Sequence, residues 1–428
     1  MGIVIPSVLI FFTCLWVWRA CDGFERASEY IGRDLSEGVR GGTINAISSS
    51  LPELFTTLIA LFILADKDGF SVGIGTTAGS ALFNGMIIPA ACIFAVIGTV
   101  VHGVKVTSIN VSSKVILRDG LSLLFCEAVL ILLINGNALY WWQGLVLVVL
   151  YIAYLLYMIL SMKSPAQNEE EQEQVEQEND TDEARSAIGS FFYWLSGGPL
   201  LDLESHFIGK EQEQKIKDKT WNGWPLLLAS TVVIGIACFV LVKACEWLGT
   251  GPGNELHSSY TLFGKEFAGI GMPTMFVAVI FASMATSVPD TVMSIRDAKD
   301  GDYDDAVANA LGSNIFDICF ALGFPLLVYT LIYGPIELSP TIAAESAELR
   351  VLLFCLTIIG FVIYFVGRRG TASDGTTYIE MKRGKALLLI ILYLVFVIYI
   401  FGLSWDASWA QQISDAIQTV LQQLVKFE

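Results

Sequence analysis

Two short stretches of the chain place an acid directly after a proline in otherwise apolar surroundings. The first is SLPELFTTL at residues 50–58, and the second is SVPDTVMSI at residues 287–295. In both, a serine, an apolar residue, a proline and an acid follow one another, and a hydroxyl residue comes four positions after the acid. A proline has no amide hydrogen to donate and pushes away the carbonyl four residues earlier. Each stretch therefore predicts a helix that is broken beside a carboxylate.

A second pair of matching stretches follows the first pair in the same order. GSALFN lies at residues 79–84, and GSNIFD lies at residues 312–317. A weaker match relates RACD at 19–22 to KACE at 243–246, upstream of each proline motif. Ordered self-similarity of this kind indicates an internal repeat. We expect the two copies to build one site together.

The candidate ligands in these motifs all offer oxygen. Two backbone carbonyls, at Ser49 and Thr286, are loosened by the prolines and need a partner within a membrane. The full set of candidates is Glu53, Asp290, Asp317, Asn84, Ser49, Ser50, Ser80, Thr286, Ser287 and Ser313, with Thr57 and Ser294 as weaker members. Calcium binds six to eight oxygens in flexible geometry, whereas copper, zinc and iron favour sulfur or imidazole. The set predicts a site for hard cations, although hydroxyl groups also bond helices together.

The composition identifies the elements that must position these residues. Apolar residues make up 54% of the 428 and charged residues only 16%, against about 25% charged in soluble domains. Apolar runs near the length of a bilayer recur along the chain. We predict an all-α polytopic membrane protein with ten transmembrane helices at 3–20, 36–64, 70–99, 120–136, 139–162, 223–248, 268–295, 303–333, 348–367 and 384–403.

The repeats divide the chain into four parts. We expect a first five-helix repeat at 1–162 with its motif at 43–84, and a second at 222–403 with its motif at 282–317. Between them lies an acidic loop at 163–221, and a tail with a short helix follows at 404–428. Because five is an odd number, the two copies enter the membrane from opposite sides. Inverted repeats with broken helices at the midplane are typical of secondary transporters.

Loop charges predict the orientation of the chain. The loops assigned to the inner side are rich in Lys and Arg, which favour the cytoplasm. These positive residues are Arg19, Arg26, Arg33, Arg40, Lys105, Lys114, Arg118, Arg368, Arg369, Lys382, Arg383 and Lys385. The loops assigned to the outer side are poor in them, and one such loop contains Glu337, Glu345, Glu348 and Arg350. We expect both termini outside and the 163–221 loop in the cytoplasm, in a plasma or inner membrane.

Other chemistries find little support in the sequence. The eight cysteines show no metal-ligand spacing, and none of the three histidines lies in an apolar segment. Much of the net charge of −17 comes from one acidic tract, and a negative chain does not indicate a nucleic-acid partner. We expect no prosthetic group and no enzymatic activity. The expected partners are inorganic cations and the lipid bilayer.

At this point the motifs resemble a known family. SSSLPELF with GSALFN, and ATSVPDTVMS with GSNIFD, are similar to the two alpha-repeats of the sodium/calcium exchanger family, within the calcium/cation antiporter superfamily. The resemblance implies ten helices and antiport by alternating access. It implies Glu53 and Asp290 as the direct calcium carboxylates, with the carbonyls of Ser49 and Thr286 as further ligands. It assigns sodium or potassium sites to the side chains of Ser50, Ser80, Asn84, Ser287, Ser313 and Asp317.

One position narrows the resemblance. Most members repeat a glutamate after the second proline, but this chain has Asp290, as the potassium-dependent sodium/calcium exchangers do. Aspartate is shorter by one methylene, so the cavity widens by about 1.5 Å, enough to favour a larger ion such as potassium. The chain departs from the family where a glycine commonly precedes the signature, because it has Ser48 and Ala285 there.

Four functions are compared on this basis. The leading prediction is an antiporter that exchanges sodium for calcium with potassium co-transport. A proton/calcium antiporter is the nearest alternative, since carboxylates also carry protons. A calcium channel would need a continuous pore lined by rings of acids. An intramembrane aspartic protease would need two acids sharing a proton and leaves Glu53 without a role.

Overall fold

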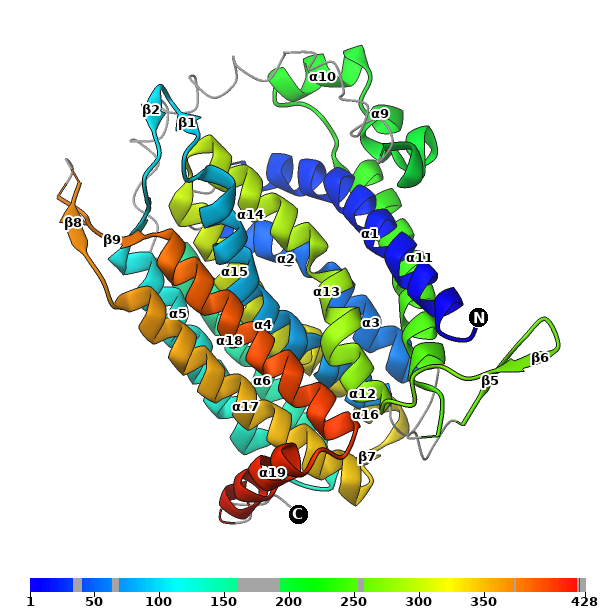
Figure 1. Ribbon diagram of the computed structural model, residues 1–428. Helices are drawn as coiled ribbons and strands as arrows, with labels where there is room; N and C mark the ends of the chain where they lie inside the picture. Colours follow the sequence, from blue (N-terminus) through cyan, green and yellow to red (C-terminus); the bar gives the residue numbers. More distant parts are fainter. Residues whose placement is uncertain are drawn as a thin grey trace.

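The computed structural model describes residues 1–33, 41–63, 69–160, 193–252, 258–372, 375–421 and 423, and it is mostly helical (Figure 1). Its long unbroken helices are α1 (Val4–Ile31), α4 (Gly69–Val96), α5 (Ser113–Leu133), α6 (Trp141–Leu160), α11 (Trp224–Gly249), α17 (Pro340–Phe365) and α18 (Arg383–Ser404). Most of the predicted acidic loop and the start of the predicted span 36–64 lie outside the described residues.

The helices confirm a multi-pass membrane protein. Within the described residues, seven helical segments are long and apolar enough to cross a membrane, and two bent helix pairs raise the number to nine. The sequence predicted ten spans, and the predicted span that is not among these nine is α5. It is 21 residues long but contains Lys114, Arg118, Asp119 and Glu127, so it is less apolar than the others.

Both predicted helix breaks are present, and they have the same construction. In the first, η1 (Gly41–Asn45) and α2 (Ala46–Ser49) precede α3 (Leu51–Phe62), with a bend of 45°. In the second, α12 (Thr274–Val277), η4 (Ala278–Ala282) and α13 (Ser283–Thr286) precede α14 (Val288–Asp300), with a bend of 41°. A serine stands at each bend, and a proline occupies the first turn of the following helix. Proline is tolerated there because the amide groups in the first turn of a helix have no hydrogen-bond acceptor within that helix.

The serines at the two bends adopt nearly the same backbone conformation. Ser50 has φ −94° and ψ 6°, and Ser287 has φ −81° and ψ 2°. A short π-helix of five residues and an α-helix of four residues precede each of them. The sequence match between the two copies is therefore also a match in backbone geometry.

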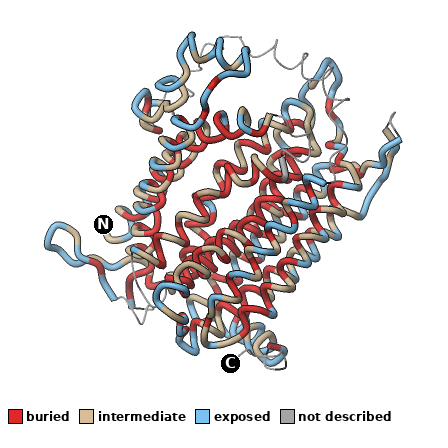
Figure 2. Tube along the Cα trace, turned by 180° about the vertical axis from the view of Figure 1, so that it is seen from behind, coloured by how far each residue is buried: buried red, intermediate tan, exposed pale blue. Residues whose placement is uncertain are grey.

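The remaining long helices surround these breaks. Helix α15 (Tyr303–Phe316) continues through η5 (Asp317–Ala321) into α16 (Gly323–Tyr333), and it packs on α4, α5 and α14. Figure 2 shows the buried residues concentrated along the central helices, and most of α4 is buried. At Gly79 a side chain would overlap the carbonyl oxygen of Val279, so only glycine permits this close approach of α4 to η4.

Contacts between helices recur in corresponding pairs. Helix α1 packs on α11, on α13 and on α14, whereas α11 packs on α3. Helix α6 packs on α16, and α18 packs on α4. If α6 is the fifth helix of the first copy, it contacts α16, which belongs to the third helix of the second copy. If α18 is the fifth helix of the second copy, it contacts α4, the third helix of the first copy. Elements far apart in the sequence thus interlock around the centre of the bundle.

Short antiparallel strands, which the sequence analysis did not predict, connect the helices at both ends. Strand β9 (Thr377–Met381) pairs with β3 (Ile109–Ser112) and with β8 (Arg369–Thr371), and β4 (Ala138–Leu139) pairs with β7 (Ile336–Glu337). Two hairpins are β1 (Val100–Val101) with β2 (Val104–Lys105), and β5 (Tyr260–Leu262) with β6 (Lys265–Phe267).

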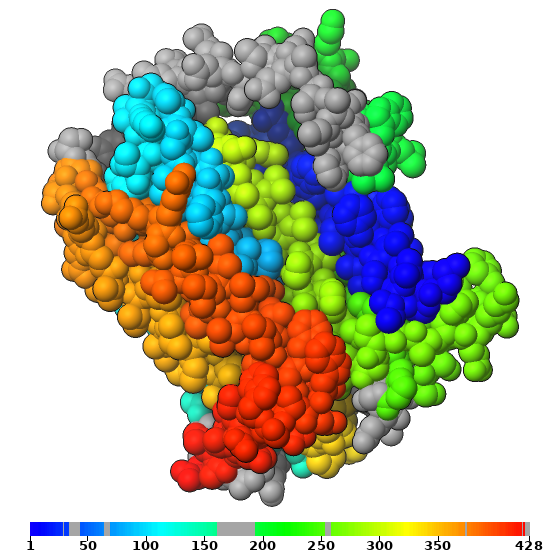
Figure 3. Space-filling view, in the orientation of Figure 1, coloured from blue at the N-terminus to red at the C-terminus, as the bar shows by residue number. Residues whose placement is uncertain are grey.

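The peripheral helices lie at opposite ends of the molecule. The predicted short helix in the tail is present as α19 (Ser408–Leu421). At the other end lie η3 (Gly198–Leu201), α9 (Leu203–Phe207) and α10 (Lys210–Lys217), as Figures 1 and 3 show. The bundle therefore has two distinct faces, one carrying α19 and the other carrying α9 and α10.

One predicted loop is instead a helix. The sequence analysis assigned Glu345, Glu348 and Arg350 to an outer loop, but all three lie in α17, which begins at Pro340. Glu348 and Arg350 are buried. Both have polar partners inside the protein, because Glu348 accepts hydrogen bonds from Tyr399 and Ser414, and Arg350 donates to Ser346 at 2.6 Å, while Arg350 Nε has no partner among the described residues. The charged residues Glu348 and Arg350, which indicated a solvated loop, therefore lie inside the protein and form hydrogen bonds there.

Candidate functional site

The two broken helices bring the predicted ligands to one place. Ser49, Ser50 and Glu53 come from the first break, and Thr286, Ser287 and Asp290 come from the second. Helix α4 supplies Ser80 and Asn84, α15 supplies Ser313, and η5 begins with Asp317. All ten candidate side chains are fully buried, with 0% of their surface exposed.

Ser80 lies at the centre of the cluster. Its hydroxyl is 3.0 Å from Glu53 Oε1 and 3.1 Å from Asp317 Oδ2, and both carboxylate oxygens can accept from it. The hydroxyl oxygens of Ser80 and Ser287 are 2.9 Å apart. A hydroxyl has one hydrogen. Ser80 can therefore satisfy only one of these acceptors at a time, and the others retain free lone pairs.

Asn84 connects the first copy of the motif to the second. Its amide nitrogen is 3.2 Å from Asp290 Oδ2 and 3.1 Å from the hydroxyl oxygen of Ser313, and it donates to both. The same nitrogen is 3.3 Å from the hydroxyl oxygen of Ser80. A side chain of the first repeat thus holds an acid of the second, so the site is built across the repeats.

The site contains more acceptors than donors. Five buried oxygens have no hydrogen-bond partner among the described residues: Ser50 Oγ, Glu53 Oε2, Asn84 Oδ1, Asp290 Oδ1 and Asp317 Oδ1. A buried polar atom left unsatisfied costs about 1–3 kcal/mol, and more if it is charged. None of the three acids forms an ion pair with a described Lys, Arg or His. These unpartnered oxygens fit the ligands that a cation substrate requires.

The backbone at each break adds further oxygens. The amide of Ser50 bonds to the Ala46 carbonyl at 3.1 Å, and the next bond across the break runs from Leu54 to the Ser50 carbonyl at 3.5 Å. In the second copy the bonds run from Ser287 to Ser283 at 2.9 Å and from Thr291 to Ser287 at 3.1 Å. The carbonyls of Ser49 and Thr286 fall between these bonds, where proline interrupts the helix.

The hydroxyl groups of Ser49 and Thr286 have a different role from their carbonyls. Ser49 Oγ donates to the Asn45 carbonyl at 2.9 Å, and Thr286 Oγ1 donates to the Ser283 carbonyl at 3.2 Å. Both bonds lie within their own helical segment, which is common for these residues. The same hydroxyls also interact with the acid of the opposite copy, Ser49 with Asp290 and Thr286 with Glu53.

The two weaker candidates are used within the protein. Thr57 Oγ1 donates to the Glu53 carbonyl at 3.0 Å, and Ser294 Oγ accepts from the Asn309 amide at 3.0 Å. Sequence reasoning did not single out Asn309 or Asn314. Both are buried on α15, and each has an amide oxygen without a partner among the described residues. The sequence signal for Asn314 was its place inside GSNIFD.

The described residues contain no group of three His, Cys, Asp or Glu side chains arranged to hold a metal ion by themselves. In the cation site, the Ser80 hydroxyl lies between Glu53 and Asp317, and the Asn84 amide contacts Asp290. A resident zinc or iron centre would use a compact set of such ligands. A cation here would instead depend on carboxylate, hydroxyl, amide and backbone oxygens together.

Comparisons with known proteins concern the whole chain rather than its single site residues. Residues 5–160 and 222–402 match the family described as sodium/calcium exchanger protein. A human sodium/potassium/calcium exchanger 5 is 26% identical over 387 residues, which cover 77% of this chain and 71% of that protein. A rat sodium/potassium/calcium exchanger 3 is 41% identical over 118 residues, which cover 27% of this chain and 17% of that protein.

A solved structure supports the fold. The crystal structure of an H+/Ca2+ exchanger is similar with a TM-score of 0.55 and 10% sequence identity, and the match covers 98% of this chain and 90% of that one. At this identity the similarity concerns the fold alone. The family match extends over most of the chain and includes both proline motifs. The chain belongs to the sodium/calcium exchanger family.

Proposed function

We propose that this protein is an antiporter that exchanges sodium for calcium with co-transport of potassium, and that Glu53 and Asp290 bind the calcium. The observation that carries the proposal is the surplus of five buried, unpartnered oxygens between two broken helices. A dehydrated calcium ion needs such oxygens to replace its water. The name of the human relative, a sodium/potassium/calcium exchanger, supports potassium as a co-substrate.

Charge balance supports the proposed ions. If Glu53, Asp290 and Asp317 are all ionised, the buried site carries three negative charges, and uncompensated charge in an apolar interior is expensive. One calcium with one potassium supplies three positive charges, and so do three sodium ions. The same three acids can thus hold either load in turn, which is the requirement for exchange.

Alternating access follows from an inverted repeat. We propose ten spans, with α5 as the fourth and α17 as the ninth, so that 1–162 and 222–403 form two five-helix repeats. The equal construction of the two breaks and the corresponding contacts of α6 with α16 and of α18 with α4 support this assignment. Rocking of one repeat against the other would open the site to each side of the membrane in turn.

We further propose that both termini lie outside and that the 163–221 loop lies in the cytoplasm of a cell with this exchanger in its plasma or inner membrane. The positions of α9 and α10 at the end opposite α19 support the two-sided arrangement. Protease added to sealed right-side-out vesicles should leave the loop intact, whereas permeabilised vesicles should show cleavage. Cleavage from the outside would reverse the orientation.

Calcium uptake into proteoliposomes tests the proposal. Gradients of sodium, potassium and protons are imposed one at a time and in combination. We expect uptake to require an outward sodium gradient and to increase with potassium on the calcium side. Uptake driven by a proton gradient alone would establish the proton/calcium antiporter instead. Uptake that needs no counter-ion gradient would indicate a channel and would overturn antiport.

A further inference from the structure

A buried acid without an ion-pair partner among the described residues lies on α5, outside the cation site. The side chain of Glu127 is 1% exposed. Its Oε1 accepts a hydrogen bond from Thr357 Oγ1 of α17 at 2.8 Å, and its Oε2 has no partner in the part of the chain that the structure describes. No described Lys, Arg or His forms an ion pair with it. A charged carboxylate in this position would be unpaired and costly.

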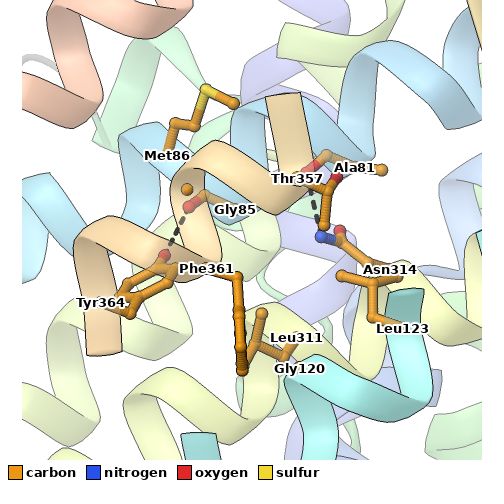
Figure 4. Close-up of a pocket in the computed structure, with 11 residues that line it drawn as sticks. Ala81, Gly85, Met86, Gly120, Leu123, Leu311, Asn314, Thr357, Phe361 and Tyr364 are labelled. Carbon is orange, nitrogen blue, oxygen red and sulfur yellow. Dashed lines mark hydrogen bonds between the residues drawn. The ribbon is translucent and has the colours of Figure 1, made fainter. Parts of the chain in front are cut away.

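A small cavity lies beside this pair, between α4, α5, α15 and α17 (Figure 4). Thr357 and Asn314 line it together with Leu123, which precedes Glu127 by one helical turn. The cavity has room for a water molecule. Asn314 Oδ1 is buried and has no partner among the described residues. The cavity therefore places Asn314 and the hydrogen-bond partner of Glu127 beside space for a water molecule.

The chemistry around Glu127 fits a proton better than a metal ion. Calcium requires six to eight oxygens, and the described neighbours of Glu127 do not provide them. The polar side chains that line the cavity include Thr357, which donates to Glu127, and Asn314. A proton needs only one carboxylate oxygen. A neutral carboxylic acid also removes the cost of an unpaired charge.

The titratable groups around Glu127 are mostly weak acids. On its own helix the neighbour is Cys126, which contacts Cys319 of η5, and on α17 it is Cys355. Helix α6 presents two tyrosines toward α5 and η5, but their electrostatic partners are other acids: Asp317 for Tyr151, and Asp119 for Tyr154. No described cation among these neighbours compensates a negative Glu127.

The cavity adjoins the helices that carry the cation ligands. Asn314 donates to the Ala81 carbonyl at 2.9 Å, joining α15 to α4. Each partner is the sequence neighbour of a candidate ligand, Ser313 and Ser80 respectively. At the other end of the cavity Tyr364 donates to the carbonyl of Gly85, which follows Asn84 (Figure 4). The cavity next to Thr357 therefore adjoins the packing directly behind the site.

We infer that Glu127 and Thr357 form a proton-binding site, separate from the cation site, and that loss of this proton changes the rate of transport. The first test is infrared spectroscopy of the calcium-loaded full-length protein, which reports un-ionised carboxylic acids. Wild type should show a carboxylic acid signal at neutral pH that Glu127→Gln lacks. Glu348→Gln is the matched control, because Glu348 accepts from Tyr399 and Ser414 and should not contribute to that signal.

The second test is the pH dependence of calcium uptake, with equal pH on both sides. Raising the pH from about 6 to about 9 should change the wild-type rate by about threefold through Glu127, and Glu127→Gln, which stays neutral, should lose that component. Thr357→Val provides a second variant, because removing the hydroxyl should shift the midpoint of the same component.

Two results would overturn the inference: a carboxylic acid signal unchanged by Glu127→Gln, or superimposable pH profiles of wild type and both variants. The pH profile rests on the proposed antiport, but the infrared test does not. If wild type transported no calcium, the proposed function would fail while the spectrum still decided whether Glu127 holds a proton.

Discussion

The two broken-helix regions have the same backbone but different charges. In each, a serine marks the bend and a proline follows it, and the bends of 45° and 41° are close. The first region with α4 contributes one acid, Glu53, and the amide Asn84. The second region with α15 and η5 contributes two acids, Asp290 and Asp317. The repeated part is therefore the broken backbone, and the unequal part is the charge.

The helices that follow the breaks differ in the same place. Helix α4 runs without interruption from Gly69 to Val96, although it contains Pro89. Its counterpart is interrupted by the π-helix η5, which begins at Asp317. Short π-helices are frequently found at functional sites. The asymmetry in backbone thus coincides with the extra acid, and the proposed function makes this position the one on which ion selectivity depends.

The largest effect should follow from neutralising either acid next to a proline. Glu53→Gln and Asp290→Asn should each reduce calcium uptake by at least about 100-fold, because calcium loses an anionic ligand in a buried site. Uptake into proteoliposomes is the measurement, with equal amounts of folded protein confirmed by size-exclusion chromatography. If one variant exchanged calcium at nearly the wild-type rate, the two breaks would not be equivalent.

An acid placed in the first copy should be the next most harmful change. Asn84→Asp adds a fourth buried negative charge and removes the amide that donates to Asp290 and Ser313. We expect calcium uptake to fall about tenfold. The double variant Asn84→Asp, Asp317→Asn restores three charges and should recover part of the loss. A double variant worse than the single one would show that position matters more than charge number.

Making the second copy like the first should change selectivity more than rate. Asp317→Asn leaves two negative charges, enough for calcium alone, so sodium-driven uptake should stay within about threefold of wild type. Its dependence on potassium should disappear across a potassium titration. A variant as potassium-dependent as wild type would exclude Asp317 as the third charge, and a wild type indifferent to potassium would exclude co-transport.

An Asp317→Asn variant that is inactive under all conditions would have a different interpretation. It would assign Asp317 directly to the calcium or sodium step, or to a protonated acid whose hydrogen bond the fold needs. Ser80 donates toward Asp317 Oδ2 at 3.1 Å, so Ser80→Ala distinguishes these cases by removing that contact without changing the charge. Loss of folded protein in both variants would indicate the structural role.

The smallest effect is expected one turn beyond the acids. Thr57→Val and Ser294→Ala should each alter calcium uptake by less than about twofold, since their hydroxyls bond to the Glu53 carbonyl and to Asn309 rather than to the free oxygens. Sodium and calcium titrations of uptake measure the change. A loss comparable to that of Glu53→Gln in only one copy would reveal an asymmetry that the backbone does not display.

The sequence predicted the two helix breaks better than the boundaries of the other helices. The spacing of Pro52 and Pro289 fixed both breaks, because proline acts locally on its own helix. The burial of the ten candidates followed from their place in apolar segments. The contact of Ser80 with Asp317 and the contact of Asn84 with Asp290 could not be predicted, since they depend on the packing of helices more than two hundred residues apart in sequence.

The errors concern polar residues that the fold buries among the helices. Glu348 and Arg350 indicated a solvated loop, but partners from α18, α19 and α17 itself accommodate them inside the bundle. Glu127 escaped attention in the same way, because its partner Thr357 lies 230 positions away. Sequence patterns indicate which segments are apolar, but they do not indicate which polar groups form hydrogen bonds with each other in the folded protein.

Equilibrium binding of calcium to the purified full-length protein would test the joint site most directly. Isothermal titration calorimetry can compare wild type with Glu53→Gln, Asp290→Asn and the control Glu348→Gln. We expect wild type and the control to bind one calcium ion per chain in competition with sodium, and each of the other two variants to lose that binding. Unchanged calcium binding in either variant, or binding that sodium does not displace, would contradict a single site shared by the two breaks.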